Sequence, residues 1–299
     1  MTEKKTDVVS RLLEAGIHFG QRRSKWNPKM KPYIWGVRNG LHIIDIRETV
    51  KGLMRAKLYI QNTIASGKDV VFVGTKRQAQ SAVQKYAGEA GMPWVTERWL
   101  GGTLTNFSTI RSRLKRLIEL EKLVESGEIE TYSKKMTSQL MREKAKITRN
   151  LDGIRNMSKL PGAMVVIDAN TEVNALREAT ALRIPTIALI DSDGNPDLVD
   201  IPIPGNDDSL RSIEVVIAEL MSAVSDGLAS RRAKEAEAQR VAENKAKEEE
   251  QAAAAHEEAK AKSSRPSFKA DDSSPEPKEN QGAAATVTAQ VPKTETDNK

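Results

Sequence analysis

The sequence predicts an α/β protein, a parallel sheet with helices on both faces. Short apolar runs recur at residues 70–73, 164–167 and 186–190. Segments with the periodicity of amphipathic helices follow the runs. Strands that are apolar along their whole length are typical of a parallel sheet buried on both sides. These observations fix the fold class before any motif is considered.

Local patterns place the elements before residue 107. We predict an amphipathic helix over 9–17, then a basic loop over 21–32. Two strands, 33–37 and 41–46, flank Arg38-Asn39-Gly40, because an Asn-Gly pair supplies the positive φ of a tight hairpin turn. The remaining elements are a helix over 50–65, the strand 70–73, a helix ending near Ala90 and a short strand over 93–96.

The alternation resumes later in the chain, with strands at 164–167, 186–190 and 198–203 and helices at 172–182 and 209–227. Two charged helices lie between the halves, broken near Ser126-Gly127. Their apolar stripes are narrow: Leu114, Leu117, Leu120 and Leu123 on one arm, and Met136, Leu140, Ile147 and Leu151 on the other. They predict an antiparallel helical hairpin, a short coiled coil, that projects from the sheet domain with few contacts to it.

The predicted organisation has four parts. Residues 1-107 and 157-229 form the α/β sheet domain, and 108-156 form the inserted hairpin. Residues 230-262 are rich in Ala, Glu, Lys and Arg and predict a charged helical extension. Residues 263-299 are too polar to bury a core and predict a disordered tail.

Charge is distributed unevenly along the chain. The net charge is +6, but residues 1–116 carry +14, from 22 Lys and Arg against 8 Asp and Glu. Residues 117–230 carry −7, and the rest carries −1. Because residues 1–116 carry such a large positive charge, we expect a polyanionic partner. The chain has no cysteine and no apolar run long enough to span a membrane, so we expect a cytoplasmic protein without disulfides or thiolate metal sites.

Enzyme signatures are incomplete. Gly74-Thr75-Lys76 follows a strand, as a phosphate-binding loop would, but the further glycines of the dinucleotide and Walker patterns are missing. The acidic stretch 191–197 looks like the start of a calcium loop. Counted from Asp191, however, the sixth position is Pro196 and the twelfth is Pro202, where such a loop needs glycine and glutamate. No nucleophile signature occurs. A nucleotide-dependent enzyme is the runner-up, and a scaffold for protein partners only is the third hypothesis.

A divalent-ion site made of His18, Asp191 and Asp207 is conceivable at the carboxyl edge of the sheet, but three residues distant in sequence do not justify it. We therefore expect no metal and no cofactor.

Basic residues with interleaved tryptophans favour RNA binding. Trp26 and Trp99 either stack on unpaired bases or lie buried as a cover on the sheet domain. Four closely spaced cations either contact phosphates or form a solvated helix face: Arg111, Arg113, Lys115 and Arg116. The candidate RNA-binding residues are Arg22, Arg23, Lys25, Trp26, Lys29, Lys31, Arg38, Lys76, Arg77, Arg98, Trp99, Arg111, Arg113, Lys115 and Arg116.

Several blocks resemble a known family. They are 13–20 (LEAGIHFG), 26–34 (WNPKMKPYI), 72–77 (FVGTKR), 98–106 (RWLGGTLTN), 160–161 (LP), 166–168 (VID), 184–185 (IP) and 203–208 (IPGNDD). In this order they resemble the family of ribosomal protein two of the small subunit, over about residues 8–229. Gln21 stands where many bacterial members carry a second histidine, which weakens the metal hypothesis further.

The resemblance implies a flavodoxin-like sheet with a coiled-coil hairpin, and a structural rather than catalytic role. It also implies a seat between head and body of the small subunit, on 16S-type ribosomal RNA. The implied protein partners are neighbouring small-subunit proteins, including ribosomal protein one. The tail beyond Arg231 exceeds the family's usual length, so the resemblance implies nothing about it.

Overall fold

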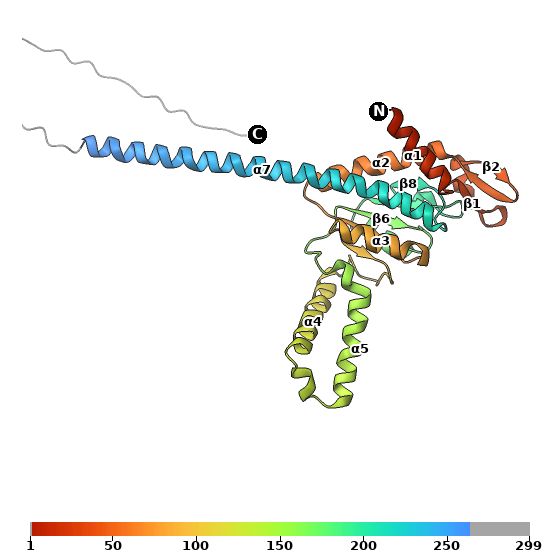
Figure 1. Ribbon diagram of the computed structural model, residues 1–299, viewed down its shortest axis with the longest axis horizontal. Helices are drawn as coiled ribbons and strands as arrows, with labels where there is room; N and C mark the ends of the chain where they lie inside the picture. Colours follow the sequence, from red (N-terminus) through yellow and green to blue (C-terminus); the bar gives the residue numbers. More distant parts are fainter. Residues whose placement is uncertain (1, 264–299) are drawn as a thin grey trace, which may run out of the picture. The chain divides into compact units, whose positions relative to one another are not determined.

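The computed structural model describes residues 2–263 (Figure 1). The chain divides into two compact units, 1–241 and 242–299, and the sheets belong to the first. The tail predicted over 263–299 therefore lies, apart from Ser263, outside the described residues.

The main sheet has five parallel strands. In spatial order they are β5 (Trp94–Val95), β4 (Val70–Val73), β6 (Ala163–Ile167), β7 (Thr186–Ile190) and β8 (Ile201–Pro204). Numbered along the chain this order is 2-1-3-4-5, the order of flavodoxin-like folds. The predicted fold class is confirmed. The predicted strand 198–203 begins later than expected, because a 3-10 turn, η5 (Pro196–Leu198), precedes β8.

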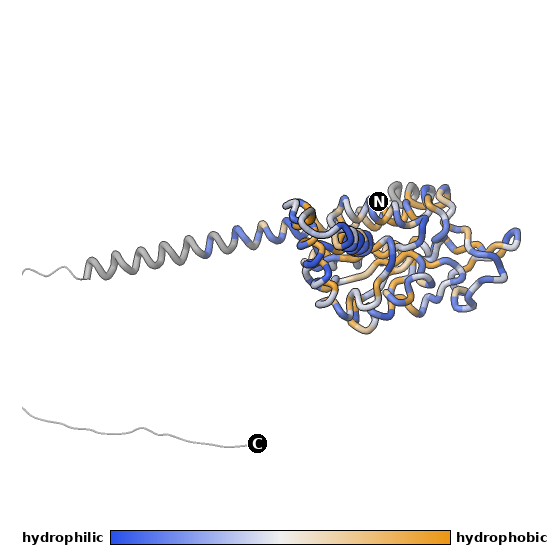
Figure 2. Tube along the Cα trace, turned by 90° about the horizontal axis from the view of Figure 1, so that it is seen from below, coloured by the Kyte–Doolittle hydropathy of each residue, from blue (hydrophilic) through white to orange (hydrophobic). Residues whose placement is uncertain are grey.

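Helices cover both faces of this sheet. One face buries Val70 and Phe72 against α1 (Thr2–Glu14), α2 (Ile46–Ala65), α3 (Arg77–Glu89) and the start of α7 (Leu210–Ser263). The other face buries Val71 and Val73 against α6 (Val173–Ala181) and the base of the hairpin. This split follows from the alternation of side chains along a strand. Figure 2 shows the hydrophobic stretches gathered within the sheet domain.

A second, smaller sheet lies where the sequence predicted a hairpin and a loop. Its antiparallel strands, in the spatial order β1-β3-β2, are β1 (Phe19–Arg22), β3 (Leu41–Ile44) and β2 (Ile34–Arg38). The predicted turn is confirmed, since Asn39 and Gly40 have φ of 52° and 76°. Strand β1 was not predicted, because four residues with a central Gly-Gln pair show no strand pattern. The rest of the predicted loop forms two 3-10 turns, η1 (Arg23–Lys25) and η2 (Pro28–Tyr33).

The inserted segment folds as an antiparallel hairpin of α4 (Phe107–Glu125) and α5 (Lys134–Leu151), joined through Gly127 in a left-handed conformation and η3 (Glu128–Thr131). Its base is attached more closely than the stripes implied. A further turn, η4 (Asp152–Ile154), brings Gly153 so near Trp94 that an added Cβ would lie 2.1 Å from the Trp94 carbonyl oxygen. The expectation of few contacts with the sheet domain is therefore wrong at the base of the hairpin.

Candidate nucleic-acid interface

The small sheet and the turns beside it form a strongly basic surface. Residues 19–44 contain six Lys and Arg and no Asp or Glu. Register pairs Leu41 with both Arg22 and Arg38, so two arginines flank one residue of the central strand. Most of the six cations have no ion-pair partner within residues 2–263, the exception being Lys29, whose Nζ lies 2.5 Å from Asp197 Oδ2. Five of the six positive charges on this surface are therefore not neutralised by an ion pair within the described residues, and the surface attracts anions.

Most of the predicted RNA-binding residues are exposed. They are Arg22, Arg23, Lys25, Lys29, Lys31, Arg38, Arg77, Arg98, Arg111, Arg113 and Lys115. Arg116 is half-buried, and its guanidinium pairs with Glu119 at 3.1 Å and Glu143 at 3.7 Å. Surface pairs of this kind contribute little stability, so they do not prevent a cation from turning to a phosphate.

The two predicted tryptophans differ. Trp99 is only 6% exposed, and its Nε1 donates to Glu178 Oε1 at 3.0 Å, so the buried alternative holds and Trp99 offers no face to a base. Trp26 is half-buried with its ring 5.1 Å from that of His42, tilted by 33°, and keeps part of its surface open.

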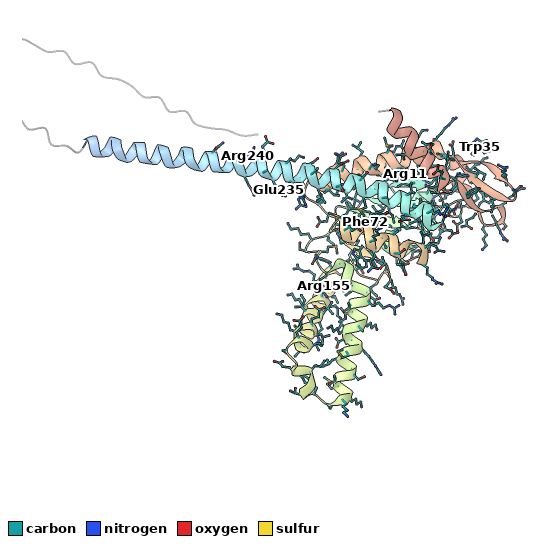
Figure 3. The ribbon with its side chains drawn as sticks, viewed as in Figure 1. Arg11, Trp35, Phe72, Arg155, Glu235 and Arg240 are labelled. Carbon is teal, nitrogen blue, oxygen red and sulfur yellow. The ribbon has the colours of Figure 1, made fainter. Side chains whose placement is uncertain are left out.

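Sequence reasoning missed Trp35. Its side chain is 78% exposed and stands at the end of the small sheet (Figure 3). The register shifts between Ile34 and Gly36, so Trp35 is the extra residue of a bulge and has no cross-strand partner. Bulges re-aim side chains in this way. The signal available in the sequence was a tryptophan beside a glycine within a hairpin strand.

One carboxylate on α6 organises the loop that leads into the hairpin. Glu178 accepts from Trp99, from the amides of Gly102 (2.7 Å) and Leu104 (2.9 Å), and from the amide and hydroxyl of Thr105 (3.2 and 3.3 Å). Burial alone would raise the pKa of Glu178, but these donors outweigh it and lower the pKa. The loop carrying Arg98 is thereby held on the sheet domain.

Lys76 was predicted to contact an RNA phosphate, but the structure pairs it with carboxylates of its own chain. Its Nζ lies 2.6 Å from Asp207 Oδ1, 2.5 Å from Asp208 Oδ1 and 3.5 Å from Asp168 Oδ2. Burial lowers the pKa of Lys76, but the hydrogen bonds to Asp207 and Asp208 outweigh it and the net shift is upward. An ammonium among three carboxylates is a counter-ion for its own chain and is not free to meet an external phosphate.

One further carboxylate, that of Asp191, lies beside Asp207 and Asp208 at the carboxyl edge of the sheet. Ligand atoms of Asp191, Asp207 and Asp208 lie within 4.8 Å of one another. Burial raises the pKa of Asp191 to about 6. The Gln21 amide donates to Asp191 at 3.2 Å and to Asp208 at 2.5 Å. Buried Nδ1 of His18 has no partner in the described part of the chain and is not in this group. The carboxylate oxygens thus hold an ammonium and an amide of the chain itself.

Comparison with known proteins identifies the family. The family described as ribosomal protein S2 matches residues 12–227. The chain belongs to the ribosomal protein S2 family. Three relatives, each called small ribosomal subunit protein uS2, come from Rhodopirellula baltica, Syntrophobacter fumaroxidans and Salinispora tropica. They are 56%, 47% and 48% identical to this chain over 221, 219 and 225 residues. The matches cover 74%, 73% and 75% of this chain, and 85%, 80% and 76% of the relatives.

A member of the ribosomal protein S2 family is a structural constituent of the small ribosomal subunit and not an enzyme, as the sequence predicted. Within residues 2–263, none of the helices has the length and apolar character needed to cross a membrane.

Contacts between side chains of the chain itself lie at the position where a doubly wound fold binds its ligand. In such sheets ligands bind beside the carboxyl ends of the strands where the strand order reverses, between β4 and β6. In this ribosomal protein Lys76 meets Asp168 across that point, and the Thr75 hydroxyl donates to the buried carboxylate of Glu172. At this position Lys76 and Thr75 are therefore engaged by carboxylates of the same chain.

Proposed function

We propose that the chain binds small-subunit ribosomal RNA through the basic surface of its small sheet, residues 19–44. One observation carries the proposal: residues 19–44 have six cations and no carboxylates, and their exposed guanidinium groups have no ion-pair partner among the described residues. RNA supplies the missing negative charge, because each phosphate neutralised by Lys or Arg releases a counter-ion. The seat between the head and body of the subunit, on 16S-type RNA, is part of the same proposal.

The test reverses three exposed cations, Arg22→Glu, Arg23→Glu and Lys25→Glu. Lys29 is left out because it is paired with Asp197. The matched control reverses three exposed cations on helices α2, α3 and α7: Arg55→Glu, Lys85→Glu and Arg211→Glu. Affinity for small-subunit RNA is measured across a salt series.

We expect the test variant to lose affinity and to reduce the slope of log affinity against log salt by about 2 to 3 units, since each lost contact contributes roughly 0.7 to 0.9. The control variant has the same net charge as the test variant, but all its cations in residues 19–44 remain, so its slope should stay that of the wild type. If both variants fold and their slopes are equal, residues 19–44 do not form the RNA-binding surface.

A second proposal concerns the protein partner. We propose that two exposed apolar side chains of strand β2, Trp35 and Val37, help to hold ribosomal protein one. They are 78% and 51% exposed. Exposed aromatic residues are typical anchors of protein interfaces, because they bury a large area at little entropic cost.

Replacing Trp35 by Ala should weaken the binding of purified ribosomal protein one to small subunits by at least about tenfold, the loss typical of a central anchor. Leu58→Ala is the control, because Leu58 is 61% exposed on α2 and lies outside the small sheet. Equal binding by both variants would place ribosomal protein one elsewhere.

A further inference from the structure

An open cavity lies at the base of the helical hairpin. Its volume is about 320 Å³, and it is lined by Leu100, Arg113, Glu143, Lys146, Ile147, Asn150 and Leu151. Leu100 belongs to the loop after β5, and the other residues belong to α4 and α5. A cavity of this size lies at the lower end of the range for small-molecule sites, the size class of a single nucleotide.

The walls of the cavity combine apolar surface with positive charge. Leu100, Ile147 and Leu151 supply the apolar part, and the last two are themselves buried. Arg113 and Lys146 are exposed and have no ion-pair partner among the side chains that the structure describes. The one acidic member, Glu143, faces Arg116 at 3.7 Å and is compensated there.

A hydrogen-bonding group completes the lining. The Asn150 amide donates to the Lys146 carbonyl oxygen at 3.0 Å, which orients the side chain and leaves its Oδ1 as an acceptor. Apolar side chains, two cations and an oriented acceptor match three features of a ribonucleotide: the face of the base, the phosphate and the polar edge of the base.

The cavity is preformed because Glu178 fixes the loop that carries Leu100. Its carboxylate binds Trp99 on one side of Leu100 and Gly102 on the other, at 3.0 and 2.7 Å. A ligand that enters a rigid site does not have to order the loop, so more of the contact energy appears as affinity.

We infer that this cavity receives one unpaired nucleotide of the ribosomal RNA. The inference rests on the proposed function and adds a specific site to it. Helix α5 carries six Lys and Arg against one Glu, so the surroundings favour a polyanion over an apolar peptide. Only a base that has left its helix can reach such a cavity, because paired bases present their edges within the grooves.

The experiment uses the full chain and two variants that change different properties. Arg113→Ala with Lys146→Ala removes the two cations, and Asn150→Trp fills the cavity without changing charge. The matched control, Lys135→Ala with Arg142→Ala, removes two exposed cations of α5 that do not line the cavity. Each protein is bound to protein-free small-subunit RNA, and base-specific chemical probes report which bases are protected.

We expect the wild-type chain and the control to protect at least one unpaired base that becomes reactive in both cavity variants. The affinity of the cavity variants should fall about tenfold. If the protection pattern and affinity of both variants equal those of the control, the inference is overturned. If Asn150→Trp fails to fold, the double alanine variant decides alone, because Arg113 and Lys146 are exposed and have no ion-pair partner in residues 2–263.

Two further outcomes are distinguishable. Normal binding to protein-free RNA but weakened incorporation into complete subunits would assign the cavity to a neighbouring protein and overturn the inference. The variant with Arg22, Arg23 and Lys25 reversed is measured in parallel. If it binds poorly while the cavity variants bind normally, the proposed function stands and only the cavity site falls; if it also binds normally, the proposed function fails as well.

Discussion

At the scale of residues, the carboxylate of Glu178 holds the loop that leads into the helical hairpin. Its two oxygens take five hydrogen bonds from four residues of one loop. Hydrogen bonds to a charged acceptor are stronger than neutral ones, and an amide that loses its acceptor at a half-buried site costs free energy. The loop therefore depends on a residue about seventy positions away along the chain.

Replacing Glu178 by Gln should lower the free energy of unfolding by roughly 2 kcal/mol near neutral pH, a value reduced for the partial exposure of the site. The amide group of Gln would face the donors of Leu104 and Thr105. Glu125→Gln, at an exposed position of α4, is the control. Urea unfolding measures both, and equal stabilities would show that the loop does not depend on the carboxylate.

The same variant has a defined pH dependence. The pKa of Glu178 is lowered in the folded state, so its stabilisation is present above the unfolded value of 4.5 and is lost as pH falls through the folded pKa. The difference in stability between wild type and Glu178→Gln should therefore shrink on acidification below about pH 4.5. A difference that grows in acid would reverse the assigned direction of the shift.

At the scale of elements, the hairpin depends on its base and not on its length. Leu114, Leu151 and Ile154 are buried in one cluster with the sheet face, and Gly153 lies against Trp94. We propose the hairpin as a separable part of the fold, provided that this base remains.

Two substitutions test the base. Gly153→Ala should lower the free energy of unfolding by roughly 2–4 kcal/mol, because the new methyl group would meet the backbone and ring of Trp94. Gly101→Ala is the control, since no atom lies within 4 Å of its added Cβ and its φ is not positive. Similar unfolding midpoints for the two variants would mean that the base yields easily and that the hairpin is only loosely attached.

At the scale of the whole molecule, we expect the folded core to be independent of the C-terminal unit. Residues 1–241 form one compact unit, and residues 234–299 contain a single aromatic, Phe268. From its composition we expect such a segment to bury little apolar area, and burial stabilises by only about 25 cal/mol per Å². Arg231, which pairs with Asp69 at 3.6 Å, marks the last ion pair between α7 and the sheet domain within the described residues.

Truncation after Arg232 should therefore leave the unfolding midpoint unchanged. The affinity for ribosomal RNA should stay within about twofold of the full-length value. The measurement is competition between full-length and truncated chains for subunits that lack this component. A loss beyond about tenfold, equivalent to roughly 1.4 kcal/mol, would show that the segment orders on the ribosome.

The sequence by itself determined the fold class, the strands at 70–73 and 186–190, the Asn39-Gly40 turn and the basic character of residues 19–44. These features depend on neighbours along the chain, where periodicity and backbone preference act. The tertiary structure alone decided that Lys76 is enclosed by carboxylates and that Trp99 is buried while Trp35 is exposed. The partners of Lys76 and Trp99 come from strand ends and helices 79 to 132 residues away, and the order of strands in the sheet, which no local pattern encodes, brings them together.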